Sequence, residues 1–166
     1  MKVDANISAD MTRTGKQAAH LESLGYDGLR IAELNHDPFL PLAIAAEHTN
    51  KVELLTSVAV AFARNPMSMA TLAHDLNAFS QGRMILGLGS QVKPHIERRF
   101  SMPWYKAARQ MREFIEAMNA IFDSWYDGER LEYIGEYYEH TLMPATFTPE
   151  NLESGRPQIN LSATGP

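Results

Sequence analysis

The stretch from Val52 to Pro66, VELLTSVAVAFARNP, constrains the fold of this chain more than any other feature. Its residues from Leu54 to Phe62 are almost all apolar, which is typical of a parallel strand covered on both faces. The closing Arg-Asn-Pro ends the run, because proline cannot donate to a ladder and disfavours the helical region at the residue before it. We therefore predict a buried strand here, with the small polar residues Thr56 and Ser57 near its rim.

Similar strands alternate with amphipathic helices along the chain. Predicted strand centres near Leu29, Ser57 and Ile85 lie about 28 residues apart, and this period predicts βαβ units and a parallel sheet. The predicted strands are 2–7, 29–32, 54–62, 84–88 and 158–162, and the predicted helices are 14–24, 40–49, 66–80 and 105–126. An open doubly wound sheet and a (β/α)8 barrel both fit this order.

The length of the chain limits how much of a barrel it can form. A (β/α)8 barrel typically has about 250 residues, whereas this chain has 166. We expect one α/β domain over residues 1–166, a partial TIM barrel with about the first five strands and a small β-hairpin, 131–141, inserted before strand five. Because the chain stops directly after strand five, leaving a sheet edge exposed, we expect it to be truncated.

Composition and charge exclude several classes of function. Apolar residues make up 45% of the chain, which is enough for a packed core. A net charge of −5 gives no electrostatic footprint for nucleic acid, and the absence of cysteine excludes disulfides and thiolate chemistry. There is no signal-like apolar segment at the N-terminus and no apolar run of about 18 residues. We expect a soluble cytoplasmic protein that does not bind membranes.

The loop after predicted strand two groups the residues best suited to chemistry. Glu33, Asn35, His36 and Asp37 follow the C-terminal end of that strand, which is the functional face of α/β folds. His36 can transfer a proton near neutral pH, with Glu33 or Asp37 to orient or tune it. The alternative is a plain turn in which Asp37-Pro38 caps the next helix.

The glycine-rich loop Gly87-Leu88-Gly89-Ser90 follows predicted strand four and can bring backbone N–H groups to a phosphate. It lacks the third glycine of a dinucleotide fingerprint and the Gly-Lys-Ser/Thr of a P-loop, so a tight turn is the alternative. The nearby His95, Arg98 and Arg99 favour phosphate, or else form a solvated helix face. No HExxH or other close histidine pair predicts a metal site.

Five segments together resemble the luciferase-like monooxygenase superfamily, and specifically its branch that uses the deazaflavin coenzyme F420. They occur in family order and cover nearly the whole chain: LGYDGLRIAE, NHDPFLPLAIAAEHT, LLTSVAVAFARNPMSMA, SQGRMILGLGSQVKPHIERRF and INLSATGP. Each segment alone is a loose match. The series is specific, above all ARNP after strand three and GRMILGLGSQV at strand four.

The resemblance implies a TIM barrel with the coenzyme at the C-terminal face of its strands. It also implies a non-prolyl cis peptide bond at the end of strand three, which falls at Ser57-Val58. The coenzyme contacts that it implies are Thr56, Ser57, Val58, Gly89, Ser90, Gln91, Ala163, Thr164, Gly165 and Pro166. It further implies an acid or an Asp-His pair after strand two, for which we expect Glu33 to contact the coenzyme and His36 to transfer a proton.

The reaction that the resemblance implies is hydride transfer between deazaflavin C5 and a small organic substrate, with the redox step supplied by the coenzyme. An FMN-dependent monooxygenase of the same superfamily is the first alternative. The alternative of another class is an inactive half-barrel that folds or binds only with its missing half or a partner. The expected partners are a small-molecule substrate and, as an open alternative, a second copy in a homodimer.

Overall fold

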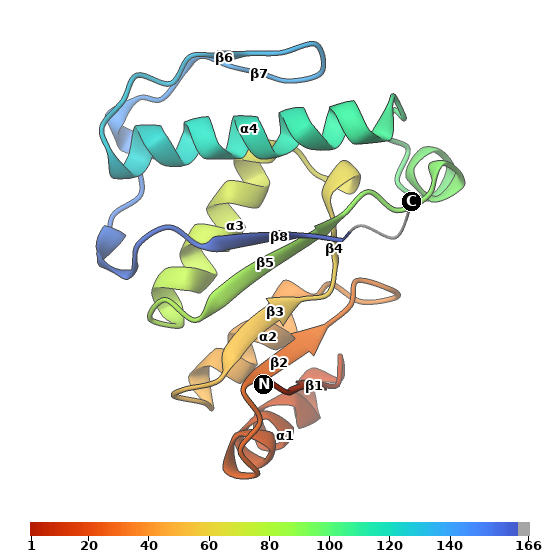
Figure 1. Ribbon diagram of the computed structural model, residues 1–166, viewed down its shortest axis with the longest axis vertical. Helices are drawn as coiled ribbons and strands as arrows, with labels where there is room; N and C mark the ends of the chain where they lie inside the picture. The colour runs from red at the N-terminus through yellow and green to blue at the C-terminus, as the bar shows by residue number, and fades with distance from the viewer. Residues whose placement is uncertain (163–166) are drawn as a thin grey trace. The chain divides into compact units, whose positions relative to one another are not determined.

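A computed structural model describes residues 1–162 of the chain, and Figure 1 shows its helices and strands. The chain forms two compact units. The first unit consists of Met1–Ala59, Ala73–Gly89 and the segment from Pro157, and the second consists of Val60–Leu72 and Ser90–Arg156. Two elements contribute residues to both units: β4 (Ala59–Val60) and α3 (Pro66–Phe79).

The first unit is built on a parallel sheet with neighbours in the order β1-β2-β3-β5-β8 (Figure 1). The strands are β1 (Asp4–Asn6), β2 (Gly28–Ile31), β3 (Glu53–Thr56), β5 (Met84–Gly89) and β8 (Gln158–Leu161). Helix α1 (Met11–Ser23) joins β1 to β2 and packs against α2 (Phe39–Glu47), which joins β2 to β3. The predicted α/β fold with a parallel sheet is confirmed.

The register of the strands separates a buried face of this sheet from an open one. Leu29, Leu54 and Met84 are aligned on successive strands and are at most 1% exposed. Because paired residues of a parallel sheet project to the same face, the neighbouring row forms the opposite face. That row consists of Asn6, Arg30, Leu55, Ile85 and Gln158, and it mixes exposed polar with apolar side chains.

Helix α1 begins three residues before its predicted start. The side chain of Asp10 is its N-cap and accepts a hydrogen bond from the backbone N–H of Thr12 at 3.0 Å. Aspartate is a preferred N-cap residue, so the sequence contained this signal. The predicted end is confirmed, because Gly25 adopts a φ of +87° directly after the helix, a conformation that glycine favours.

The strand predicted from the long apolar run ends earlier than predicted. β3 stops at Thr56, and the following residues form the cis peptide bond Ser57-Val58, the short β4 and a 3-10 turn at Ala61–Ala63. The prediction of a strand through Phe62 is therefore wrong, whereas the prediction of a cis bond at Ser57-Val58 is confirmed. Residues 59–62 are at most 1% exposed, so the apolar run in the sequence indicates that these residues are buried and not that they all pair in a β-ladder.

At the opposite end of the sheet, where β3 begins, one carboxylate holds the incoming turn. Glu22 of α1 accepts hydrogen bonds through Oε1 from the backbone N–H groups of Lys51 at 2.7 Å, Asn50 at 2.9 Å and Val52 at 3.1 Å. Burial acts to raise the pKa of Glu22, but these N–H donors and the charge of Arg83 outweigh it, so the pKa is lowered.

Arg83, which precedes β5, fixes the same turn from its other side. Its guanidinium donates to the carbonyl oxygens of Ala46 and Thr49, each at 3.0 Å, and of Val52 at 3.1 Å. It also donates to the Thr49 hydroxyl at 2.9 Å and, through Nε, to the Ser80 carbonyl at 2.8 Å. The end of α2, the start of β3 and the end of α3 thus share one side chain.

The second unit is organised around the long helix α4 (Ala107–Tyr126), as predicted from its apolar stripe. The hairpin of β6 (Tyr133–Ile134) and β7 (Glu139–His140) is antiparallel, which confirms the predicted insertion, and it is tied to α4 by a hydrogen bond from Tyr137 N to Glu113 Oε2 at 2.8 Å. Farther along, the Arg156 guanidinium binds the carboxylates of Asp123 and Asp127 near the end of α4.

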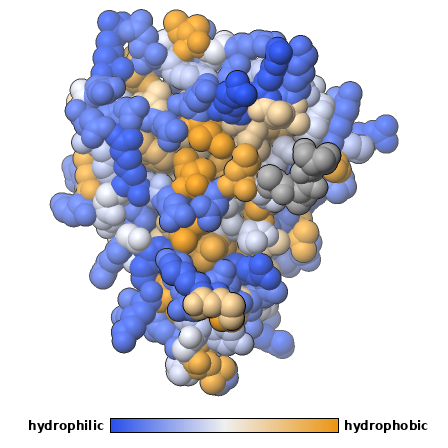
Figure 2. Space-filling model, viewed as in Figure 1, coloured by the Kyte–Doolittle hydropathy of each residue, from blue (hydrophilic) through white to orange (hydrophobic). Residues whose placement is uncertain are grey.

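Around α1, β1 and β2 the surface is largely hydrophilic, with small apolar spots (Figure 2). Met11 and Leu24, at the two ends of α1, are 50% and 62% exposed. Such scattered apolar side chains are normal on a protein surface. Within residues 1–162, no helix is long and apolar enough to cross a membrane.

Candidate functional site

The first unit brings several predicted site residues to the C-terminal ends of β2 and β3. The backbone N–H of Ser57 donates to Ile31 O at 2.7 Å, and the N–H of Glu33 donates to Val58 O at 3.1 Å. The Ser57-Val58 segment is therefore held on both sides by the residues that end β2. Ser57 is exposed and Val58 is half-buried, so this segment forms a fixed wall that faces solvent.

Close packing against β5 supports this wall from behind. The Thr56 hydroxyl donates to Gly87 O and accepts from Gly87 N, each at 2.8 Å, and Thr56 is only 2% exposed. A Cβ at position 87 would lie 2.0 Å from Thr56 O, and a Cβ at position 89 would lie 2.6 Å from Val58 Cγ2. Glycine is thus required at Gly87 and Gly89 because the end of β3 approaches β5 so closely.

The loop after β2 presents its side chains in two different ways. Glu33 is 8% exposed and lies next to the wall through its backbone bond to Val58. Asn35 and His36 are exposed. Asp37 Oδ1 accepts from the N–H groups of Phe39 at 2.8 Å and Leu40 at 3.3 Å, which confirms the capping alternative for this residue.

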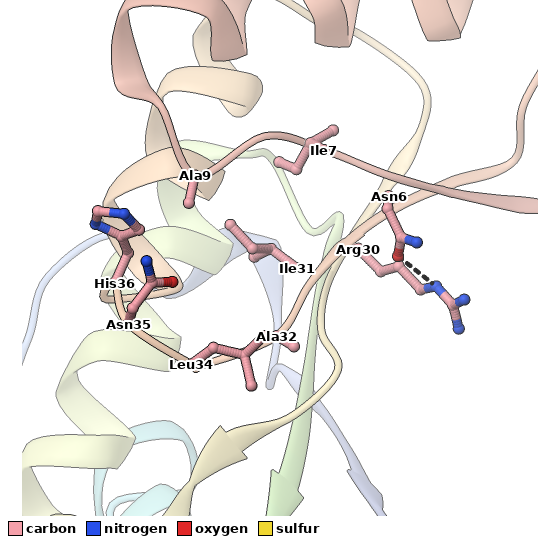
Figure 3. Close-up of a pocket in the computed structure, with 9 residues that line it drawn as sticks. All are labelled: Asn6, Ile7, Ala9, Arg30, Ile31, Ala32, Leu34, Asn35 and His36. Carbon is pink, nitrogen blue, oxygen red and sulfur yellow. Dashed lines mark hydrogen bonds between the residues drawn. The ribbon is translucent and has the colours of Figure 1, made fainter.

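A pocket of about 270 Å³ lies between this loop and the loop after β1 (Figure 3). His36 and Asn35 lie together at one end of it, and Ile7, Ala9 and Ile31 form its middle. At the other end Arg30 Nε donates to Asn6 Oδ1 at 3.0 Å, and both of these side chains point away from His36. The remaining lining residues are Ala32 and Leu34.

The coenzyme contacts predicted directly after β5 divide between the two units. Gly89 belongs to the first unit, whereas Ser90 and Gln91 belong to the second. There the Ser90 hydroxyl donates to Gln91 O at 3.1 Å, and Gln91 Oε1 lies 3.1 Å from His95 Nδ1. The predicted contacts at Ala163, Thr164, Gly165 and Pro166 lie outside the described residues.

The basic segment after β5 forms one turn of π-helix, His95–Arg99, in the second unit. Lys93 Nζ lies 3.7 Å from Glu97 Oε1, and the Arg99 guanidinium lies 4.6 Å from the centre of the Phe100 ring. Lys93 and Arg99 thus have local partners, and a phosphate contact by His95, Arg98 and Arg99 stays a prediction. Within residues 1–162, no group of three His, Asp or Glu side chains is arranged to hold a metal ion.

Sequence reasoning missed the pocket because its walls come from two loops that lie far apart in the chain. Asn6 is the last residue of β1, and Ile7 and Ala9 follow it, where the sequence predicted only a strand over residues 2–7. Arg30 could not be predicted as a pocket residue, since one charged residue in a strand does not by itself indicate a site.

The family model described as luciferase-like monooxygenase matches residues 2–166. The chain belongs to the luciferase-like monooxygenase family. The uncharacterized protein Rv1360 of Mycobacterium tuberculosis is 50% identical over 165 residues, which are 99% of this chain and 48% of that protein. A protein of the same organism named "Putative coenzyme F420-dependent oxidoreductase Rv3520c" is 33% identical over 105 residues, which are 63% of this chain and 30% of that protein.

Two solved structures of luciferase-like proteins share the fold. The coenzyme F420-dependent tetrahydromethanopterin reductase of Methanopyrus kandleri has a TM-score of 0.75 at 20% identity, covering 99% of this chain and 50% of that one. The FMN complex of the oxygenating constituent of 3,6-diketocamphane monooxygenase, from the CAM plasmid of Pseudomonas putida, has a TM-score of 0.79 at 18% identity, covering 97% and 51%. The chain thus spans about half the length of these luciferase-like relatives, and it matches half of their barrel.

Proposed function

We propose that this chain carries the coenzyme-contacting wall and the proton-transfer loop of an oxidoreductase that uses coenzyme F420. The reaction is hydride transfer between deazaflavin C5 and a small organic substrate. The observation that carries the proposal is the wall at Ser57-Val58, which is held by the end of β2, lies next to Glu33 and faces solvent. This is the end of a parallel sheet at which α/β enzymes build their sites.

The wall fits a flat ring system. Its backbone groups are already used by Ile31 and Glu33, so the segment is fixed before any ligand arrives. Val58 packs its side chain against Gly89, and Ser57 remains exposed. Ser57 and Val58 can therefore contact the ring of a deazaflavin directly, while Thr56 supports the wall through its bonds to Gly87.

Sequence similarity favours F420 over FMN. The relative named for F420 is 33% identical to this chain over 105 residues, and this similarity supports F420 as the coenzyme proposed here. The FMN-bound structure is 18% identical, and similarity at that level supports the shared fold alone. FMN remains the alternative coenzyme, and the chemistry that either coenzyme supplies when bound is redox transfer at its ring.

Glu33 and His36 have different roles in this proposal. Glu33 is 8% exposed and its backbone N–H is bonded to Val58 of the wall, which supports a role beside the coenzyme, where its carboxylate would accept hydrogen bonds from ring N–H groups. His36 is exposed at the end of the pocket, where a substrate oxygen can exchange a proton with its imidazole. The coenzyme would supply the hydride chemistry when bound, and residues of this chain would position its ring and transfer the proton.

The test is a parallel titration of the purified chain with oxidised F420 and with FMN, followed by the fluorescence anisotropy of each coenzyme. We expect F420 to bind at least tenfold more tightly than FMN. Tighter binding of FMN would transfer the proposal to the monooxygenase alternative. Binding of neither coenzyme would favour the alternative of a half-barrel that is inactive without further chain.

A matched pair of variants locates the coenzyme on the wall. Ser57→Trp places a bulky side chain on the exposed wall, and we expect it to abolish F420 binding. Ser23→Trp places the same side chain at an exposed position at the end of α1, and we expect it to leave binding unchanged. Urea midpoints of both variants establish that each is folded. Equal loss of binding in the two variants would contradict the placement.

A further inference from the structure

The sulfur chemistry of this chain belongs to methionine alone, because the sequence has nine methionines and no cysteine. Hydroperoxides oxidise the methionine thioether to a polar sulfoxide, and methionine sulfoxide reductases restore it. Burial divides the side chains into three groups. Met1 and Met11 are at least 50% exposed, Met67, Met102 and Met143 are half-buried, and Met69, Met84, Met111 and Met118 are at most 5% exposed.

Met143 differs from its neighbours in the segment 141–147, which directly follows β7 in the second unit. Every residue of this segment except Met143 is exposed. Leu142 is 76% exposed and Phe147 is 72% exposed. A small oxidant can therefore reach the segment from solvent. Met143 is the residue of the segment that turns toward the protein.

The sulfur of Met143 contacts α4. It accepts a hydrogen bond from Trp125 Nε1 at 3.3 Å, and Trp125 is 4% exposed. The Trp125 ring packs edge-to-face on Phe122 of the same helix, with the ring centres 5.8 Å apart. Farther along the chain, the Tyr126 hydroxyl donates to Gly155 O at 2.9 Å. The chain after β7 is thus tied to α4 at two places, and the sulfur of Met143 makes the first of these contacts.

A sulfoxide at Met143 disrupts this contact wherever its oxygen is placed. An N–H···O hydrogen bond needs a nitrogen–oxygen distance of about 2.9 Å. An oxygen inserted between Nε1 and the sulfur therefore forces these two atoms more than 3.3 Å apart, and Met143 moves away from α4. An oxygen on the solvent side leaves an electron-poor sulfur facing the indole N–H, which weakens the hydrogen bond.

We propose that Met143 is a reversible oxidation site and that its sulfoxide releases the segment 141–147 from α4. The sulfur lone pair attacks one oxygen of a hydroperoxide, so an S–O bond forms and the O–O bond breaks. With hydrogen peroxide, the second oxygen leaves as water with both protons. The sulfur loses two electrons, which the peroxide gains. In the reverse step a reductase and a dithiol return two electrons, the dithiol becomes a disulfide, and the oxygen leaves as water.

The experiment treats the full chain with hydrogen peroxide and follows Trp125. The substitution Trp104→Phe removes the other tryptophan, so that the emission comes from Trp125 alone. Peptide mass spectrometry measures the sulfoxide at each methionine. We expect Met143 to be oxidised faster than Met118, with a red shift of the Trp125 emission and stronger quenching by acrylamide.

Limited proteolysis measures the release of the segment. Chymotrypsin cleaves after Leu142 and Phe147, and we expect this cleavage to be about fivefold faster in the oxidised chain, since proteolysis depends on local opening. Far-UV circular dichroism should stay unchanged, because α4 remains folded. The two methionine sulfoxide reductases, one for each epimer, should restore both the emission and the cleavage rate.

Matched variants assign the response to one sulfur. Met143→Leu cannot be oxidised at this position, and we expect peroxide to leave its emission and cleavage unchanged. Met102→Leu replaces another half-buried methionine of the second unit and should keep the full response. Met143→Gln places a polar group there without oxidation and should be cleaved about fivefold faster than the parent chain before any peroxide is added. If Met143→Leu is itself released, the reversal by the reductases in the parent chain decides.

Four results would overturn the inference. They are oxidation of Met143 no faster than that of Met118, a sulfoxide at Met143 with unchanged emission and cleavage, a response that persists in a folded Met143→Leu variant, and a response that the reductases do not reverse. Loss of the circular dichroism signal together with the response would indicate global unfolding and would also contradict the release of a local segment. No coenzyme is present in these measurements, so their outcome is independent of the proposed function.

Discussion

The two ends of the parallel sheet in the first unit are built in opposite ways. At the end where β3 begins, the side chains of Glu22 and Arg83 bond to backbone groups of three neighbouring segments. At the end where β2 and β3 stop, Ser57 and His36 project into solvent. In barrel folds the first kind of end serves stability and the second serves function.

The contrast extends to the hydrogen-bonding side chains at each end of the sheet. The Arg83 guanidinium donates hydrogen bonds to carbonyl and hydroxyl oxygens of the protein, so few of its N–H groups remain for a ligand. At the opposite end, Asn35 and His36 border a pocket instead of closing it. Substitutions at the two ends should therefore have opposite signatures, and four predictions follow this contrast from large effects on stability to negligible ones.

The largest effect is expected for Arg83→Ala. This change leaves the carbonyls of Ala46, Thr49 and Val52 without their donor, and the free energy of unfolding should fall by about 3 kcal/mol. Urea denaturation measures it. Arg112→Ala, on an exposed position of α4, is the control and should change stability by less than about 0.5 kcal/mol. Equal losses of stability in the two variants would contradict the claim that Arg83 holds the end of the sheet where β3 begins.

Thr56→Val tests the buried support behind the wall. The variant keeps the shape of the side chain but leaves both Gly87 N–H and Gly87 C=O without the hydroxyl, which should cost about 2 kcal/mol. Thr56→Ser keeps the hydroxyl and should cost about 0.8 kcal/mol for the lost methyl group. Thermal or urea unfolding compares the two. A serine variant as unstable as the valine variant would contradict the role of the hydroxyl.

The contribution of Glu22 should depend on pH. Its pKa is lower in the folded chain than the ordinary value of 4.5, so the folded state binds this proton less tightly than the unfolded state. The stabilisation is present above the ordinary value and is lost as the pH falls through the folded value. We expect Glu22→Gln to be less stable than the wild type at pH 7, by about 1 kcal/mol. This difference should shrink in urea midpoints measured toward pH 3, and a constant difference would contradict the assignment.

The smallest effects on stability are expected at the exposed end. His36→Gln and Asn35→Ala remove exposed side chains, and each should change the free energy of unfolding by less than about 0.5 kcal/mol. Urea denaturation measures both changes. A large loss of stability in either variant would mean that this end is structural as well.

Much of the fold was predictable because the strand and helix periods agree over several units. The helices predicted at 14–24 and 105–126 and the strands predicted at 29–32 and 84–88 agree with α1, α4, β2 and β5 to within three residues at each end. The end of β3 was not predictable from spacing, since Ala59 and Phe62 are as apolar as the residues of the strand. Only the resemblance to luciferase-like proteins indicated that the chain leaves strand geometry at Ser57-Val58.

The site was predictable in part for the same reason. A polar loop after a buried strand indicated Glu33 and His36, but the sequence did not distinguish Asp37 as a cap from Asp37 as a partner of His36. Its bonds to Phe39 and Leu40 show that Asp37 caps α2, and a role of Asp37 beside His36 stays a prediction. The pocket depends on how two loops lie relative to each other in space. The residues around Ile7 and Ala9 form no sequence pattern from which that arrangement could be predicted.

The most direct test of the account is to map F420 on the chain by NMR. The account predicts that added F420 shifts the amide resonances of Ala32, Glu33, Ser57 and Val58, while those of residues 49–52 at the opposite end of the sheet stay in place. Shifts concentrated at residues 49–52, or no shifts at saturating F420, would contradict the claim that the exposed end of β2 and β3 is the coenzyme site.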